Sequence, residues 1–347
     1  ARLVRRRELV EVLRGVYVDH TGPTSWQQRA WAAVLWAWPA ALAGQSAWRA
    51  FEGPGRRSRE VERLHVVVER HRRLTAPPGI VLHRRSGFAD RVLWNLGPPR
   101  VRLEEAVLDV ALAAPDELGT IAALADAAAD DTGGLDGLVN NAGVMMCPYQ
   151  TTEDGFEMQM GVNHLGHFAL TGRLMPLLEE APAARVVSVS SIAHRSAQID
   201  FDNFFFESSD DYSPLTAYRC SKLANLLFSQ ELQARLERRG SSVMAVAAHP
   251  GVSRTDLGRY VETNPIAGRF FQLFFRFAQS PVMGAQPQMR ALVDPDVKGG
   301  EFYGPDGFRG MSGFPVLETP RPQALLESSR KQLWEISEEL TGVRYSL

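Results

Sequence analysis

Two residues with the right chemistry and spacing to move a proton together are Tyr218 and Lys222. On a helix, residues four positions apart lie on one face, so the phenol and the ammonium group could reach one reacting centre. A free phenol titrates near ~10, too high for proton transfer at neutral pH, and a neighbouring cation lowers that pKa. The pair could then give a proton to a carbonyl oxygen. Taken alone, this spacing is also common on solvent-exposed helices.

Three further polar positions add to this pair. Ser191 follows the last residue of an expected strand, where its hydroxyl could hold a substrate oxygen. Asn163 lies in the middle of an expected helix, where an amide has poor helix propensity. The segment at residues 140–143 ends another strand. Each has an ordinary structural explanation by itself, and only their order and spacing together indicate a site.

The second part of the chain alternates strands and helices, which is typical of parallel βαβ units. Strands are expected at residues 135–139, 185–190, 242–248 and 300–303, and helices at residues 153–180, 216–239 and 322–340. Each polar motif then lies at the carboxyl end of a strand or on the next helix. Open α/β sheets bind their ligands at this edge.

The first part of the chain is rich in arginine and has a different pattern. Here we expect strands at residues 15–18, 65–70 and 80–85, and helices at residues 25–38, 101–113 and 115–129. The chain is therefore predicted to hold two domains. A small α+β module occupies residues 1–128, and an α/β domain occupies residues 129–347.

Five motifs in the second part, taken in order, resemble the short-chain dehydrogenase/reductase family. They lie at residues 135–144, 162–168, 187–191, 218–222 and 249–252. Within that family the chain looks closest to the retinol-dehydrogenase-like branch. The carrying features are the long insertion between Ser191 and Tyr218, the continuation at residues 221–225, and the tail at residues 300–306. The resemblance covers about residue 134 to the end.

This resemblance implies an NAD(P)-dependent oxidoreductase that acts on the alcohol or carbonyl group of an apolar substrate, an alcohol, aldehyde or ketone. Tyr218 would be the proton donor and acceptor, and Lys222 would lower its pKa and bond the nicotinamide ribose. Ser191 would polarise the carbonyl, and Asn163 would hold a water molecule in a relay to Lys222. The cofactor-binding residues that it implies are Asn140, Ala142, Gly143, Tyr218, Lys222, Pro250, Gly251, Val252 and Thr255.

Two groups of phenylalanines remain open to two interpretations. They are the residues Phe201, Phe204, Phe205 and Phe206, and the segment at residues 270–277. They would either cover an apolar substrate or belong to the hydrophobic core.

The glycine-rich turn with which the family begins is not found in this sequence. Such a turn presents backbone N–H groups and a helix N-terminus to the cofactor pyrophosphate. After Gly22, the next required glycine position holds Trp26, and the Gly-Pro-Gly segment at 53–55 has Ser58 at its third glycine position. The expected fold is therefore a partial doubly wound (Rossmann-like) parallel sheet that lacks its first βαβ unit. The choice between NADP and NAD stays open, because the deciding residue follows a strand that is missing.

The segment at residues 107–110 has two interpretations as well. It resembles the third strand of the family, whose aspartate, here Asp109, contacts the adenine. Its surrounding apolar residues recur at helical spacing, and this pattern favours a helix.

Residues 1–128 resemble, less specifically, the amino-terminal region of AbiEi-type antitoxin-like proteins. The carrying segments are residues 5–10, 15–20, 26–31 and 98–106. The resemblance implies a winged-helix-like module whose basic residues at 2–14 contact DNA phosphates. A solvated basic helix face is the alternative. A rival function is therefore a non-catalytic fusion product or a DNA-contacting regulator.

Composition limits the remaining classes of function. With 347 residues, 45% of them hydrophobic, and a net charge of −2, the chain is globular and has no general field for nucleic acid. Its two cysteines cannot form a disulfide framework. The start lacks the apolar run of a signal peptide, and no apolar stretch approaches the about 20 residues of a membrane span. We therefore expect a cytoplasmic protein. His164 and His167 lack a third ligand, so no metal site is expected.

Overall fold

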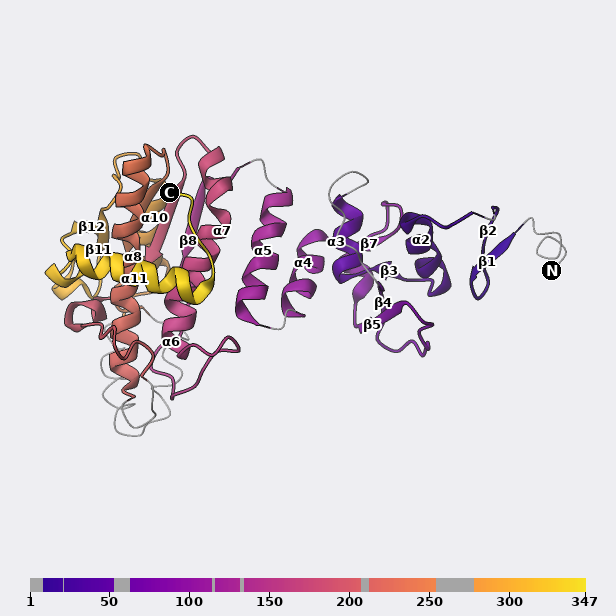
Figure 1. Cartoon of the computed structure of the whole chain (residues 1–347), viewed down its shortest axis with the longest axis horizontal. Helices are drawn as coiled ribbons and strands as arrows, with labels where there is room; N and C mark the ends of the chain where they lie inside the picture. Colours follow the sequence, from indigo (N-terminus) through magenta and orange to yellow (C-terminus); the bar gives the residue numbers. More distant parts are fainter. Residues whose placement is uncertain are drawn as a thin grey trace. The chain divides into compact units, whose positions relative to one another are not determined.

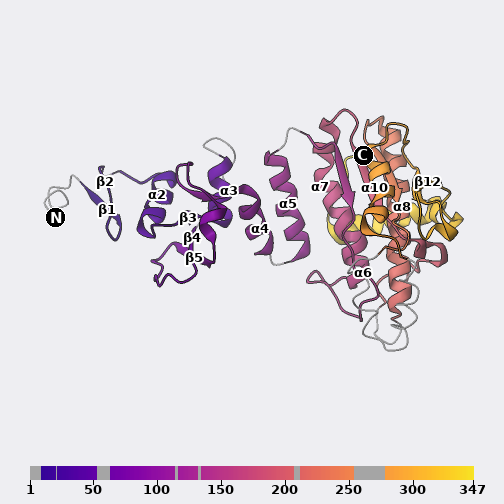
Figure 2. The same ribbon diagram turned by 180° about the vertical axis from the view of Figure 1, so that it is seen from behind.

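The computed structural model of the chain describes residues 9–20, 22–52, 63–113, 116–131, 134–206, 212–253 and 278–347. Packing divides the chain into two compact units, Ala1–Ala114 and Pro115–Leu347. Their elements are labelled in Figure 1 and seen from behind in Figure 2. Helix α5 (Glu117–Asp131) packs against α7 (Gly166–Glu180) of the second unit. The domain boundary predicted after residue 128 stays a prediction.

The first unit contains a mixed five-stranded sheet in the order β5-β4-β3-β7-β6. Its strands are β3 (Ala41–Leu42), β4 (Leu64–Glu69), β5 (Ile80–Arg85), β6 (Val92–Leu93) and β7 (Arg100–Val101). Its helices are α2 (Trp26–Trp36), α3 (Gly44–Glu52) and α4 (Leu103–Leu112). The segment at residues 107–110 thus lies within a helix, α4, which packs on α3, as its apolar spacing favoured.

The start of the described chain forms an antiparallel hairpin of β1 (Val10–Leu13) and β2 (Val16–Val18). Strand β2 was predicted. The alternative of a basic helix at residues 2–14 is wrong for residues 10–13, because they form a strand that pairs with β2. Residues 1–8 lie outside the described residues. The winged-helix-like interpretation of this unit stays a prediction.

The second unit is an α/β fold around a five-stranded sheet in the order β12-β11-β10-β9-β8. Its strands are β8 (Gly137–Asn140), β9 (Arg185–Val189), β10 (Met244–Ala248), β11 (Phe302–Pro305) and β12 (Pro315–Glu318). Strands β8 to β11 run parallel, as the alternating pattern predicted, and β12 is antiparallel to β11. Strand β12 was not predicted.

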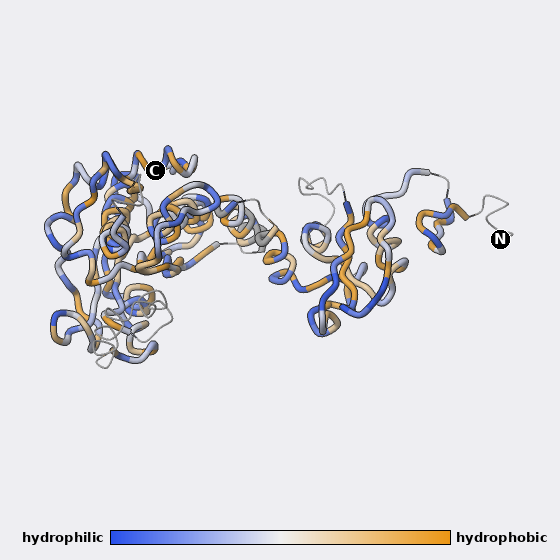
Figure 3. The backbone as a smooth tube through the Cα atoms, turned by 90° about the horizontal axis from the view of Figure 1, so that it is seen from below, coloured by the Kyte–Doolittle hydropathy of each residue, from blue (hydrophilic) through white to orange (hydrophobic). Residues whose placement is uncertain are grey.

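Helices cover both faces of this sheet. Alternate residues of β9 point to opposite faces, Val186 toward α7 and α8 (Pro214–Arg239) and Val187 toward α10 (Pro281–Val293). Helix α11 (Glu327–Thr341) packs along α8. In Figure 3, hydrophobic and hydrophilic residues interchange along the helical segments of the chain. Among the described residues, no helix has the length and apolar character needed to cross a membrane.

The helix predicted at residues 153–180 begins later and is interrupted. Glu157 caps the short helix α6 (Met158–Met160) by accepting hydrogen bonds from the backbone N–H groups of residues 159 and 160. A widened π-helical turn follows at Gly161–Leu165, and α7 continues from it. The predicted start at residue 153 is wrong because this cap fixes the first turn five residues later. π-helical turns inside helices are frequently functional, and this one contains the fully buried Asn163.

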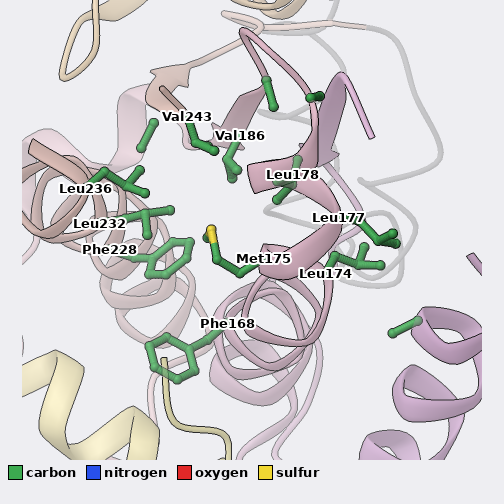
Figure 4. Packing of buried hydrophobic residues seen from close by; sticks show 14 of the residues in the cluster. Phe168, Leu174, Met175, Leu177, Leu178, Val186, Phe228, Leu232, Leu236 and Val243 are labelled. Carbon is green, nitrogen blue, oxygen red and sulfur yellow. The ribbon is translucent and has the colours of Figure 1, made fainter. Parts of the chain in front are cut away.

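Side chains from α7, α8 and β9 converge in the main core of the second unit (Figure 4). In this core, the Phe168 ring contacts three other aromatic rings. Its ring centroid is 5.6 Å from that of Phe228, 5.1 Å from that of Trp334 and 4.9 Å from that of Tyr345. This aromatic group holds α7, α8, α11 and the C-terminal segment against one another.

We predict that Phe168→Ala lowers the free energy of unfolding by about 3–5 kcal/mol, because the buried ring leaves a cavity that its neighbours cannot fill. Urea unfolding followed by circular dichroism measures this loss. The matched control is Phe308→Ala, whose ring is 73% exposed and whose removal should change stability by less than ~0.5 kcal/mol. Equal losses in the two variants would contradict the described core.

Candidate active site

A cavity of about 740 Å³ in the second unit lies at the carboxyl ends of β8, β9 and β10. Of the residues predicted from the sequence, its wall contains Ala142, Gly143, Ser191, Tyr218, Lys222, Pro250, Gly251 and Val252. They come from three loops and one helix. The parallel sheet brings these segments to one edge, where such folds hold their ligands.

Helix α8 presents Tyr218 and Lys222 to the cavity. It begins with Ser213 as N-cap and Pro214 in its first turn, which fixes the start of the helix one turn before Tyr218. The Lys222 ammonium lies 5.9 Å from the centre of the Tyr218 ring and donates a hydrogen bond to the Val189 carbonyl oxygen over 3.2 Å. The Ser191 side chain forms a hydrogen bond with the Tyr218 side chain. A substrate oxygen placed here would meet both hydroxyl groups.

Burial is the largest cause of the pKa shifts of Tyr218 and Lys222. It raises the pKa of the Tyr218 phenol to about 12, although the hydrogen bond with Ser191 acts in the opposite direction. It lowers the pKa of the Lys222 ammonium to about 8. The expected lowering of the Tyr218 pKa by Lys222 is not met in this structure, because burial raises this pKa and the side chain that lowers it is Ser191.

The side chain of Asn163 joins the wall of the cavity to α8. Its Oδ1 accepts a hydrogen bond from the Val144 N–H over 2.8 Å, and its Nδ2 donates to the Val144 carbonyl and to Ser221 Oγ over 2.9 Å each. Gly143 fits closely beside it. A Cβ at that position would lie 2.9 Å from Asn163 Oδ1 and 3.6 Å from Lys222 Nζ. A glycine is therefore needed where the loop passes the two side chains.

Two predicted cofactor residues are not placed in the cavity wall. The Asn140 side chain is buried and donates from Nδ2 to Thr171 Oγ1 over 2.9 Å, so it faces α7. Its neighbour Asn141 lines the cavity in its place, because successive residues at a strand end point to opposite sides. Thr255 lies outside the described residues.

The four phenylalanines Phe201, Phe204, Phe205 and Phe206 are not part of the cavity wall. Phe204 is buried in a core cluster with α8, and Phe201 and Phe205 pack against that cluster. Phe206 contacts the Tyr212 ring. Of the two interpretations, the core is the one found for Phe201, Phe204 and Phe205. The segment at 270–277 lies outside the described residues.

One wall of the cavity was not predicted from the sequence. It is formed by α10, from which Gly284, Ala285 and Gln288 face the cavity. The signal was present, since Ser280 is an N-cap and Pro281 occupies the first turn. That pair typically begins a helix. The second proline, Pro287, interrupted the helical pattern that would have confirmed it.

These residues fit the nicotinamide and ribose end of a dinucleotide cofactor. The cavity has enough volume for a ring, two hydroxyl-bearing side chains point at one place, and the buried Lys222 ammonium can reach a ribose hydroxyl. At the phosphate end, β8 is the last strand of the sheet within the described residues. A glycine-rich turn beside it is not found in this part of the chain.

Residues 83–204 match the family model of the short chain dehydrogenases. Retinol dehydrogenase 14 of Mus musculus is 42% identical over 212 residues, which are 60% of this chain and 60% of that protein. Retinol dehydrogenase 13 of Mus musculus is 40% identical over 253 residues, which are 71% of this chain and 69% of that protein. The chain belongs to the short-chain dehydrogenase family.

The solved structure of an uncharacterized protein from Mycobacterium Paratuberculosis is similar to this chain. It is 39% identical, covers 66% of this chain and 74% of its own chain, and superimposes with a TM-score of 0.53. The retinol-dehydrogenase-like branch predicted from the motifs is confirmed by the relatives. The chain spans about 60% of the length of the first curated relatives it matches. The family match also begins at residue 83, earlier than the limit of about 134 expected from the motifs.

We predict that Lys222 makes the stability of this short-chain dehydrogenase depend on pH. Burial lowers the pKa of Lys222 from 10.5 to about 8, so between these values the unfolded chain binds more protons than the folded one. Stability from this group therefore rises as pH increases from about 8 to 10.5. Urea unfolding of the wild type and of Lys222→Met at about pH 7 and pH 10 should show the wild type gaining relative to the variant at the higher pH. A constant difference would contradict the burial of the ammonium group.

Proposed function

We propose that this short-chain dehydrogenase transfers a hydride between NADP or NAD and the alcohol or carbonyl group of a small apolar substrate. The observation that carries the proposal is the arrangement of Tyr218, Ser191 and Lys222 at one wall of the cavity. Two hydroxyl groups meet there beside a buried cation. Such groups can move a proton to or from the substrate oxygen while the carbon bonded to that oxygen is reduced or oxidised.

The nicotinamide cofactor, when bound, would accept or supply the hydride. In the direction of reduction, the Tyr218 hydroxyl gives its proton to the substrate oxygen, and the Ser191 hydroxyl donates a hydrogen bond to that oxygen. The Lys222 ammonium then stabilises the phenolate that remains. With a pKa of about 8, Lys222 is mostly protonated at neutral pH and can fill this role. Asn163 keeps Gly143 and Lys222 in place through its bonds to Val144 and Ser221.

The character of the cavity wall supports an apolar substrate. Met145, Met146, Ile192 and Leu215 contribute hydrophobic side chains close to the reacting residues. Flexible methionine side chains adapt to irregular apolar shapes. The named relatives are retinol dehydrogenases, which agrees with a hydrophobic alcohol or aldehyde as the class of substrate. We also propose that the protein is located in the cytoplasm.

The affinity for the cofactor is proposed to be weak. Binding energy from the remote pyrophosphate and adenine normally holds the reacting ring in position, and such positioning can lower the barrier by ~7–11 kcal/mol. The cavity contains residues that could bind the nicotinamide end of the cofactor. The glycine-rich turn that would bind the phosphates is not found in the sequence. The non-catalytic fusion product and the DNA-contacting regulator remain rival predictions from residues 1–128.

We predict that Tyr218→Phe lowers the rate of reduction of a hydrophobic aldehyde by about 10²–10⁴-fold, because the ring is kept and only the proton donor is lost. Binding of NADPH and NADH, followed by their fluorescence, should change by less than about twofold, since the phenol hydroxyl contributes little to the affinity.

The control is Tyr149→Phe, a partly exposed tyrosine in the same unit that is outside the cavity wall and should leave the rate unchanged. A wild-type protein that neither binds the reduced cofactors at millimolar concentration nor turns over an aldehyde would overturn the proposed function. A micromolar dissociation constant with a clear rise in Tm would instead overturn the proposal of weak binding.

A further inference from the structure

Behind the cavity, a charged network links two loops that belong to different walls. It consists of Arg195, which follows the Ser191 loop; Glu318, the last residue of β12; and His249, which precedes the Pro250–Gly251 loop. Arg195 Nη2 lies 2.9 Å from Glu318 Oε2, and His249 Nε2 lies 3.1 Å from Glu318 Oε1. Each carboxylate oxygen thus bonds a different loop.

The hydrogen bonds fix which nitrogen of His249 carries the proton. The Gly251 N–H can only donate, and it donates to His249 Nδ1 over 3.1 Å. Nε2 is therefore the protonated nitrogen and donates to Glu318. A chain of two hydrogen bonds runs from Glu318 to the backbone of Gly251, a residue of the cavity wall.

The loop held in this way has a demanding backbone. Gly251 has φ +63°, a left-handed conformation that favours glycine, and the next residue, Val252, donates its N–H to the Met311 carbonyl over 2.7 Å. A Cβ at Gly251 would collide with that same carbonyl. The loop therefore depends on contacts with neighbouring segments for its shape.

On the other side, Arg195 connects the network to the Ser191 loop. Its Nη1 donates to the Arg309 carbonyl over 2.6 Å. Its neighbour His194 contacts the Ser191 carbonyl through Nδ1 over 2.6 Å, and the backbone N–H of His194 donates to the same oxygen. The segment that carries Arg195 is thus fixed directly to Ser191.

The surroundings leave little room for this network to shift. The His249 side chain is fully buried, and those of Glu318 and Arg195 are 16% and 25% exposed. Two glycines make the space. A Cβ at Gly304 would collide with His249 and Glu318, and one at Gly310 would lie 2.9 Å from Arg195 Nη2 and 3.0 Å from Glu318 Oε1.

We propose that Glu318 is a positioning residue of the active site: its carboxylate, bonded by Arg195 and His249, sets the Ser191 loop and the Pro250–Val252 loop at a fixed separation. This inference rests on the proposed function, because the Ser191 loop would hold the substrate oxygen and the Pro250–Val252 loop the nicotinamide. Glu318 is not among the residues of the cavity wall. It acts through the two loops that contribute residues to that wall.

The consequence for catalysis is a split between the kinetic constants. Loss of Glu318 leaves the Tyr218 and Lys222 side chains unaltered on α8, so the chemical step keeps its proton donor. The cofactor loses a preformed wall and binds to a loop that must first be ordered. The Ser191 loop also loses the bond through Arg195, but its local bonds to Ala193 and His194 remain. We therefore expect Glu318→Ala to raise the KM for NADPH by about tenfold and to lower kcat by a smaller factor, about threefold.

Hydrogen–deuterium exchange on the full chain without cofactor tests the network independently of activity. In Glu318→Ala, the peptide covering residues 249–253 should exchange at least about tenfold faster than in the wild type, because the Gly251 and Val252 amides lose their protection. Glu318→Gln keeps an oxygen that can accept from His249 but loses the charge paired with Arg195, so its effect should be smaller. The matched control is Glu327→Ala, which removes an exposed carboxylate paired with Lys331 and should change neither exchange nor KM.

The outcomes separate the inference from the proposed function. Unchanged exchange at residues 249–253 in Glu318→Ala overturns the inference, whatever the activity. If Glu318→Ala does not fold, Glu318→Gln decides in its place, and wild-type exchange and KM in that variant overturn the inference. A wild type without cofactor binding overturns the proposed function, while the exchange of the variants still decides whether Glu318 positions the loop.

Discussion

The hydrogen bonds of the buried Asn163 amide are the constraint on which the site depends. One amide satisfies both the N–H and the carbonyl group of Val144, and it also bonds Ser221 on the helix of Tyr218. A buried polar group that loses its partner costs about 1–3 kcal/mol, so the three segments cannot separate cheaply. The widened turn at Gly161–Leu165 places this amide in the interior.

A second set of bonds fixes α8 to the end of β9. The Val189 carbonyl accepts from both Lys222 Nζ and Asn225 Nδ2, and Ser190 Oγ donates to the Lys222 carbonyl over 2.7 Å. The reacting side chains therefore stand on a rigid helix that is joined at several points to a central strand. Sites built on such elements hold their geometry better than sites on loops. The loops after β9 and β10 need separate support, and the residues around Glu318 provide it.

The open side of the sheet has a different character. Strand β8 is the last strand within the described residues, and its Val139 is 37% exposed. The family match nevertheless begins at residue 83 and includes the sequence of α4, which folds in the first unit. For that segment, helical spacing and packing against α3 outweigh the resemblance to a strand of the family. Within the described residues, β8 is therefore an edge strand, and an edge strand presents backbone groups that no neighbouring strand bonds.

The sequence by itself determined the family, the parallel order of the strands and the residues that gather at their carboxyl ends. Those properties follow from local patterns, because apolar runs and periodicity report single elements and motif order reports how they follow one another. Tertiary structure alone decided that Asn141 and not Asn140 faces the cavity, that burial raises the pKa of Tyr218, and that Glu318 reaches His249 across 69 positions of sequence. The direction of a side chain, its loss of hydration and its distant partners depend on residues brought together only by folding, and no local pattern contains them.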